Sequence, residues 1–99
     1  MDEILKKREK IFKKALQKWG FKAQSIILME ECAELIKAVS KMNRTDNPDF
    51  MYEEIADVQI MIEQMIHYYG EEAEEKILKN YKNKIKRLEE RLNESKADI

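Results

Sequence analysis

Two long apolar segments joined by one turn decide the fold. The first reads FKAQSIILMEECAELIKAVSKM over residues 21–42, and the second reads DFMYEEIADVQIMIEQMIHYY over residues 49–69. Apolar residues recur in both at helical spacing, and residues 43–49 between them (NRTDNPD) are the one cluster of strong turn formers. The sequence therefore predicts two consecutive helices, with Asp49 as the N-cap of the second.

A further helix is predicted on each side of this pair. Residues 2–19 have apolar side chains at helical spacing and end before Gly20, and residues 71–97 follow Gly70. The last helix begins with acidic residues and becomes rich in Lys and Arg, the order that the helix dipole favours. Its apolar residues form a coiled-coil-like seam of only two heptads, made of Leu78, Tyr81, Ile85, Leu88 and Leu92.

The composition favours one all-α domain over residues 1–99. The chain of 99 residues has 2 Gly and 1 Pro, too few for the tight turns of an all-β fold. We expect a four-helix bundle of antiparallel helices that is completed by oligomerisation. No apolar run approaches the roughly 20 residues of a membrane span, and the N-terminus does not resemble a signal peptide. The single Cys32 fits a reducing cytoplasm and is expected in the core.

The charges are nearly balanced in total but are partitioned along the chain. The net charge of −1 argues against bulk electrostatic binding to nucleic acid or to an anionic membrane. Residues 1–23 carry a balance of +5, residues 24–66 of −6 and residues 67–99 of zero. Most such charge runs are solvated helix faces, so the direction in which the central acids point decides their meaning.

Several of the central acids fall on apolar helix faces. Glu54 and Asp57 project into the apolar arc of the 49–69 helix and have no cation three or four residues away. On the 21–42 helix, Glu31 lies within the apolar arc and Glu34 at its margin. Burying ionised carboxylates without a partner is costly, so a compensating charge is required.

Two explanations for these acids remain open from the residues alone. Acids at helix margins are commonly paired with lysines from other helices. Alternatively, two i, i+3 carboxylate pairs on adjacent antiparallel helices converge and hold a hard divalent cation, since oxygen-only ligands suit Mg²⁺ or Mn²⁺. His67 is the only histidine, so the two Glu-x-x-His motifs of ferritin-like diiron bundles are excluded.

The same residues resemble a known family signature. Glu30-Glu31-Cys32-Ala33-Glu34, nineteen further residues and then Glu54-Ile55-Ala56-Asp57 resemble the EExxE…ExxD motif of the MazG-like all-α nucleotide pyrophosphohydrolases. The stretch from about Trp19 to Arg91 also resembles the small single-domain members that phages and bacteria encode.

The resemblance implies a Mg²⁺-dependent hydrolase. Its reaction cleaves a nucleoside triphosphate between the α and β phosphates, releasing the monophosphate and pyrophosphate, and Mn²⁺ is a possible substitute for Mg²⁺. The implied metal ligands, carried over position by position, are Glu31, Glu34, Glu54 and Asp57. Glu34 is our choice for the carboxylate that activates the attacking water, in keeping with its marginal position.

Further residues are assigned to the substrate. The resemblance includes a basic segment with an Asn after the ExxD helix, and one polar face of the last helix matches it with Lys79, Lys82, Asn83 and Lys86. We assign this face to the triphosphate, although a solvated lysine face is the ordinary interpretation. Trp19 and Gln24 are candidates for the nucleobase pocket, with a core position as the alternative for Trp19.

We therefore expect a cytoplasmic homodimer or homotetramer that hydrolyses noncanonical or deoxynucleoside triphosphates and binds neither nucleic acid nor membrane. Phosphoribosyl-ATP pyrophosphohydrolase is the alternative within the same fold. A non-catalytic helical oligomerisation or regulatory module, with its acids paired to lysines from the first or the last of the four helices, is the alternative from a different class.

Overall fold

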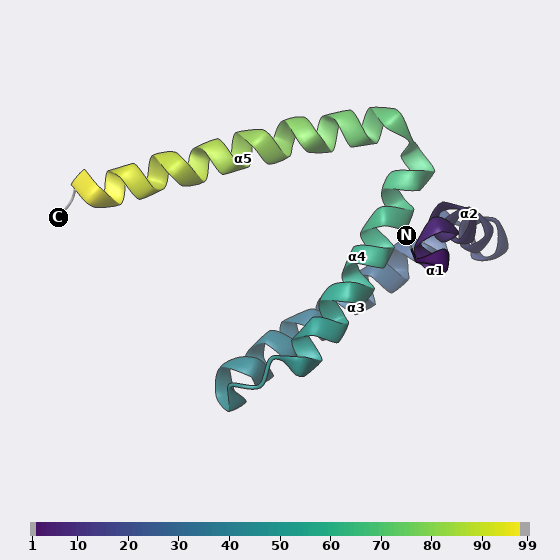
Figure 1. The fold of residues 1–99 in the computed structure, drawn as a ribbon, viewed down its shortest axis with the longest axis horizontal. Helices are drawn as coiled ribbons and strands as arrows, with labels where there is room; N and C mark the ends of the chain where they lie inside the picture. The colour runs from purple at the N-terminus through teal and green to yellow at the C-terminus, as the bar shows by residue number, and fades with distance from the viewer. Residues whose placement is uncertain (1, 98–99) are drawn as a thin grey trace. The chain divides into compact units, whose positions relative to one another are not determined.

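The computed structural model describes residues 2–97, with side chains described through residue 94, and its regular structure is entirely helical (Figure 1). The helices are α1 (Glu3–Lys6), α2 (Arg8–Trp19), α3 (Phe21–Thr45), α4 (Asp49–Tyr69) and α5 (Glu71–Ala97). The expected all-α class is therefore confirmed. Over the described residues, no helix combines the length and apolarity needed to cross a bilayer.

The chain divides into two compact units. The first is Met1–Tyr68 and contains α1 to α3 and nearly all of α4, and the second is Tyr69–Ile99 and consists mainly of α5. A single catalytic domain over residues 1–99 and a four-helix antiparallel bundle stay predictions.

The predicted N-terminal helix over residues 2–19 is instead two helices, α1 and α2. Asp2 caps α1 by accepting a hydrogen bond from the Ile4 backbone N–H at 2.9 Å. The helix then tightens, because the Lys7 N–H donates to the Ile4 carbonyl three residues earlier, at 3.2 Å. Lys7 keeps right-handed helical angles, so α2 continues directly after it.

A glycine joins α2 to α3 where the sequence predicts it. Gly20 has φ +87°, a conformation that side-chain-bearing residues rarely adopt. Its N–H donates to the Leu16 carbonyl at 2.9 Å, and its carbonyl accepts from the Gln24 N–H at 3.2 Å. The same residue therefore ends one helix and begins the next.

The turn between α3 and α4 is shorter than predicted. Helix α3 continues past residue 42 to Thr45 and is closed by Asp46, which has φ +59° and donates from its N–H to the Met42 carbonyl at 2.8 Å. Asp49 is not the N-cap of α4, because it lies inside the helix and its own N–H donates to Asn47 Oδ1 at 3.1 Å. The capping side chain is therefore that of Asn47, as its short amide favours. The predicted bounds of α4 and α5 are confirmed.

Helices α3 and α4 form an antiparallel hairpin (Figure 1). Three pairs tie α3 to α4: the Phe21 and Tyr68 rings with centroids 4.3 Å apart, the Gln24 and Gln64 side chains hydrogen-bonded at 2.7 Å, and Lys41 Nζ at 3.7 Å from the Phe50 ring centroid. As the α3 residue number rises in these pairs, its α4 partner's number falls. The two helices therefore run in opposite directions along most of their length.

The first unit has a small buried core. Its buried apolar residues are Phe12 from α2, Ala38 from α3, and Val58 and Met61 from α4. Two polar side chains are buried with them, those of Gln24 and Gln64. The expectation that Cys32 packs in the core is wrong: its side chain is exposed on α3.

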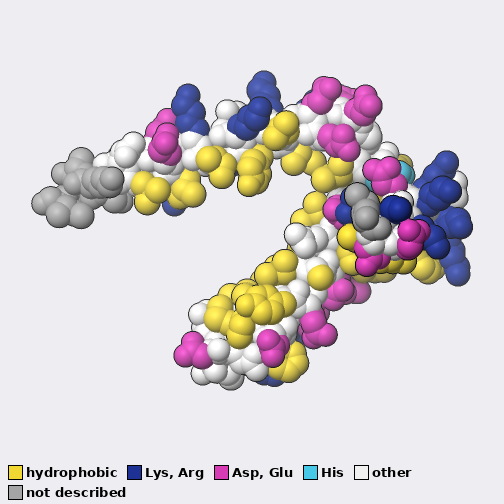
Figure 2. All heavy atoms as spheres, viewed as in Figure 1, with side chains coloured by type: hydrophobic (Ala, Val, Ile, Leu, Met, Phe, Trp, Pro, Cys, Tyr) yellow, Lys and Arg dark blue, Asp and Glu magenta, His cyan; other side chains and the backbone are white. Residues whose placement is uncertain are grey.

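Helix α5 carries an exposed apolar stripe along its length. Figure 2 shows hydrophobic side chains along one side of α5 and Lys and Arg side chains along another. The five predicted seam residues and Ile77 are each about half exposed. On the first turn of the helix, the Glu72 carboxylate accepts from Lys76 Nζ at 2.7 Å.

Candidate metal centre

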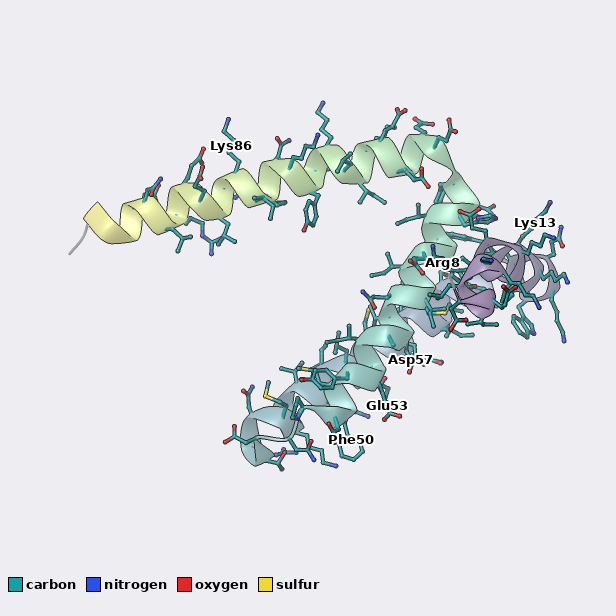
Figure 3. The ribbon with its side chains drawn as sticks, viewed as in Figure 1. Arg8, Lys13, Phe50, Glu53, Asp57 and Lys86 are labelled. Carbon is teal, nitrogen blue, oxygen red and sulfur yellow. The ribbon has the colours of Figure 1, made fainter. Side chains whose placement is uncertain are left out.

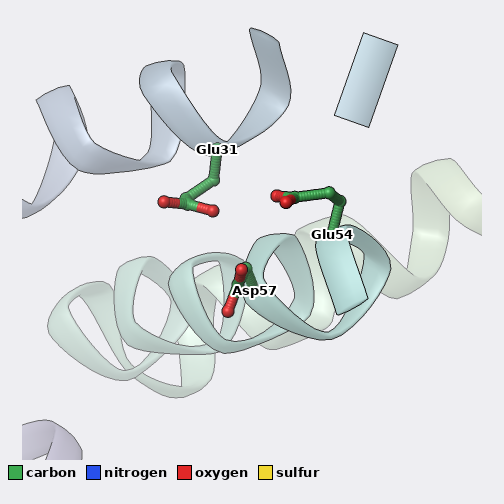
Figure 4. Close-up of side chains that lie close together, drawn as sticks. All are labelled: Glu31, Glu54 and Asp57. Carbon is green, nitrogen blue, oxygen red and sulfur yellow. The ribbon is translucent and has the colours of Figure 1, made fainter. Parts of the chain in front are cut away.

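Three carboxylates from two helices meet in the α3–α4 hairpin (Figure 4). Glu31 comes from α3, and Glu54 and Asp57 come from α4. Each offers a carboxylate oxygen, and these oxygens all lie within 4.8 Å of one another. We call Glu31, Glu54 and Asp57 the acidic triad.

Helix geometry explains how the triad forms. Glu54 and Asp57 are three residues apart, so their side chains leave α4 from neighbouring turns on one side. Glu31 reaches the same place from α3 because the antiparallel hairpin sets the middle of α3 against the first half of α4. The site therefore forms only when α3 and α4 pack against each other.

The triad is partly withdrawn from water. Glu31 and Glu54 are half-buried and Asp57 is exposed. The Oε2 atom of Glu54 is shielded from solvent and has no hydrogen-bond partner. Within the described residues of the first unit, the ion pairs do not involve any of the three acids. Pairing of these acids with lysines of the first helices, one form of the alternative explanation, is therefore not seen within this unit.

The electrostatics of the triad act on Glu31. Loss of solvation raises the pKa of the Glu31 carboxyl above its ordinary value of 4.5, and the adjacent carboxylates of Asp57 and Glu54 raise this pKa further. Holding three ionised carboxylates together is thus unfavourable in the protein without a bound cation.

The donor set fits a hard divalent cation. Carboxylate oxygens are the ligands that Mg²⁺ and Mn²⁺ prefer, and a site with three protein carboxylates leaves positions open for water and phosphate oxygens. A cation would also satisfy the shielded Glu54 oxygen that lacks a partner. The residues present therefore fit the group that the sequence motif implies.

Glu34 does not belong to the group of converging oxygens. Its side chain is 51% exposed, and its Oε1 lies 3.4 Å from Lys37 Nζ on the next turn. The marginal, water-accessible position expected of Glu34 is thus observed, and it is separate from the triad. Whether Glu34 binds a metal or acts as a base stays a prediction.

The two nucleobase candidates lie in different surroundings. Gln24 is buried, with an exposed fraction of 3%, and its amide donates from Nε2 to Gln64 Oε1. Trp19 is 57% exposed at the end of α2, with Lys18 Nζ at 5.3 Å from its ring centroid. The alternative core position of Trp19 is therefore not what the structure shows.

The predicted triphosphate-binding residues lie in the second unit. Lys79, Lys82, Asn83 and Lys86 are all exposed on α5, and Figure 3 shows the Lys86 side chain extending from that helix. Their spacing keeps them on one side of α5, as expected. Their contact with a substrate stays a prediction.

One buried polar residue of the same hairpin, two helical turns from the triad, was not predicted from the sequence. Gln64 is buried on α4 and pairs with Gln24, although glutamine is ordinarily a surface residue. Its spacing was an available signal: Gln64 follows Asp57 by seven residues, as Glu31 follows Gln24. A glutamine at the same helical position as an inward-facing acid is a candidate for burial.

Comparisons with models of protein families, with curated proteins and with solved structures found no match to this chain.

Proposed function

We propose that this protein is a divalent-cation-dependent nucleoside triphosphate pyrophosphohydrolase of the MazG-like type. The observation that carries the proposal is the acidic triad, in which carboxylate oxygens from both motif segments lie within 4.8 Å of one another. The order and spacing of the two motifs, which resemble the signature of that family, also support the proposal. Within the first unit the triad has no ion pair with a lysine, so the non-catalytic alternative would need lysines of the last helix to neutralise these acids.

The proposed reaction is attack of water on the α-phosphorus of the nucleotide. A P–O bond forms from the water, the bond from the α-phosphorus to the oxygen bridging to the β-phosphorus breaks, and pyrophosphate leaves with that oxygen. The water loses a proton to a carboxylate, which we assign to Glu34 because its side chain is open to solvent. Bound Mg²⁺ supplies neutralisation of phosphate charge and a lower pKa of coordinated water.

The chain's own residues divide the remaining tasks. Glu31, Glu54 and Asp57 hold the cation, and the exposed Lys79, Lys82 and Lys86 with Asn83 bind the outer phosphates. Trp19, which is exposed at the end of α2, is the candidate for stacking on the base. Noncanonical and deoxynucleoside triphosphates are the proposed substrate class, by resemblance.

We further propose that the protein works as a homodimer or homotetramer, with the apolar stripe of α5 buried against a second copy. The stripe is long, continuous and spaced like a coiled-coil seam, and its residues are about half exposed. Stable dimers bury about 800 Å² on each partner. A 27-residue helix with six large apolar side chains on one side provides a surface of that order.

A substrate panel with product identification tests the proposed activity. Purified protein is incubated with ordinary, deoxy and noncanonical nucleoside triphosphates and with phosphoribosyl-ATP, each with Mg²⁺ or Mn²⁺. Phosphorus NMR then distinguishes monophosphate plus pyrophosphate from diphosphate plus phosphate. We expect monophosphate and pyrophosphate. If phosphoribosyl-ATP is the only compound hydrolysed, the protein is instead a phosphoribosyl-ATP pyrophosphohydrolase.

Neighbouring acids supply matched controls for the site. Glu31→Gln and Glu54→Gln remove triad ligands and should abolish turnover, whereas Glu30→Gln and Glu53→Gln change exposed acids one residue earlier and should retain it. Absence of turnover for every nucleotide with both cations, or equal losses in the control variants, would contradict the proposal.

A further inference from the structure

A buried pair of amides lies between the two helices that carry the triad. Gln24 on α3 and Gln64 on α4 are 3% and 5% exposed, and Gln24 Nε2 donates to Gln64 Oε1 at 2.7 Å. Gln64 Nε2 donates in turn to Met61 Sδ at 3.4 Å, while Gln24 Oε1 is buried without a partner. Burying polar groups and leaving one unsatisfied disfavours folding, so the pair is not explained by stability alone.

The amide pair and the triad occupy matching positions along the hairpin. Gln24 precedes Glu31 by seven residues on α3, and Gln64 follows Asp57 by seven residues on α4. Seven residues are about two helical turns, or roughly 10.5 Å of rise, and return to nearly the same side of a helix. The amide pair therefore lies two helical turns from the Glu31 and Asp57 carboxylates, between the same two helices.

The triad depends on the register of the hairpin. Glu31 is on one helix and its two partners are on the other, so sliding α4 by one turn would move Glu31 by about 5.4 Å relative to them. The buried apolar residues of α3 and α4 are Ala38, Val58 and Met61, and the small side chain of Ala38 and the flexible one of Met61 adapt readily to a displacement. A hydrogen bond between two buried amides does not tolerate it, as a single buried polar residue fixes register in coiled coils.

We propose that Gln24 and Gln64 are positioning residues that fix the register of α3 against α4 and thereby hold the acidic triad together for cation binding. The part of this inference that concerns cation binding rests on the proposed function. The part that concerns the register of the two helices does not depend on it. It assigns Gln24 a role within the protein in place of a contact with the nucleobase.

The register is measured first, without any metal or substrate. Spin labels are placed at Asn43→Cys and Glu63→Cys in a Cys32→Ser background, on exposed positions near opposite ends of the hairpin. The expected separation is roughly 25 Å along the helix axis, at about 1.5 Å per residue. We expect a single narrow distance distribution in the parent protein. In the Gln24→Leu/Gln64→Leu variant we expect a broad distribution or one displaced by about one turn.

Cation binding is measured second, on unlabelled protein. Titration of Mn²⁺ followed by electron paramagnetic resonance should show an affinity at least ten-fold lower in the double Leu variant, although the variant stays helical by circular dichroism. Gln24→Leu alone serves if the double variant does not fold. The matched control is Gln59→Leu, an exposed glutamine on α4, which should keep the parent distance and affinity.

The outcomes separate the two claims. A parent-like distance distribution and parent-like Mn²⁺ affinity in the double variant would overturn the positioning role. If the parent protein itself fails to bind Mn²⁺, the proposed function fails, and the distance distributions still decide whether the amide pair fixes the register.

Discussion

The buried amide pair leads to an unequal effect of two similar substitutions on stability. In Gln64→Leu, Gln24 Nε2 loses its acceptor while Gln24 Oε1 still lacks a donor, so a second buried polar atom becomes unsatisfied. In Gln24→Leu, Gln64 Oε1 loses its donor, but the unsatisfied Gln24 Oε1 is removed together with its side chain. The first change therefore adds an unsatisfied group, and the second exchanges one such group for another.

The expected magnitudes follow from this count of unsatisfied atoms. Each newly unsatisfied buried group lowers the free energy of unfolding by about 1–3 kcal/mol. We expect Gln64→Leu to lose roughly that amount and Gln24→Leu to lie within about 1 kcal/mol of the parent, since its two effects nearly cancel. The double variant has no unsatisfied amide and gains apolar burial, so it should be at least as stable as the parent.

Urea unfolding of the four proteins measures these differences. The protein concentration is held fixed because self-association contributes to apparent stability, and the slope m is compared to confirm a common transition. Gln59→Leu is the exposed control and should change the unfolding free energy by no more than about 0.5 kcal/mol. Equal losses in the two single variants that add up in the double variant would refute this reasoning.

Three further outcomes are expected. Mn²⁺ at about 100 times its dissociation constant should stabilise the protein by about 2.7 kcal/mol, seen as a rise in Tm, and the rise should disappear in Glu54→Gln but not in Glu53→Gln. Because the pKa of Glu31 is raised above 4.5, the folded state holds this proton more tightly than the unfolded chain, and the associated stability is lost as pH rises from 4.5 through the folded pKa. Unfolding curves in metal-free buffer should therefore show that the free energy of unfolding of the parent falls relative to that of Glu31→Gln over this pH range. A difference between the two proteins that does not change with pH would contradict this expectation. Leu88→Asp should lower the molar mass measured by sedimentation to that of one chain, whereas Glu90→Ala, an exposed change on the opposite side of α5, should not.

Helical periodicity and turn chemistry predicted most of the secondary structure. The end of α4 and the start of α5 matched because Gly70 separates the two helices in a conformation that glycine favours. The predicted end of α3 at residue 42 was three residues too early, since the helix continues to Thr45 and is closed by Asp46 in the left-handed conformation. Local sequence indicates that a turn is present, but the residue that adopts positive φ depends on competing hydrogen bonds.

The site was predictable where it depends on position along one helix. Glu54 and Asp57 lie on the same side of α4 because of their spacing, and Glu31 stands out as an acid on an apolar face. The separation of Glu34 from the converging oxygens was not predictable, because it depends on how α3 is rotated against α4. The exposure of Cys32 follows from the same rotation, which periodicity alone does not determine.

The division of the triad between α3 and α4 also affects how the protein moves. Of the triad, only Glu54 and Asp57 stay close in sequence when the chain unfolds, so binding by all three carboxylates requires the closed hairpin. A bound ion therefore opposes each opening fluctuation that separates the two helices. Backbone amides of α3 and α4 that exchange with deuterium through such openings should be protected together when the ion is added, and chelation should release both helices at once.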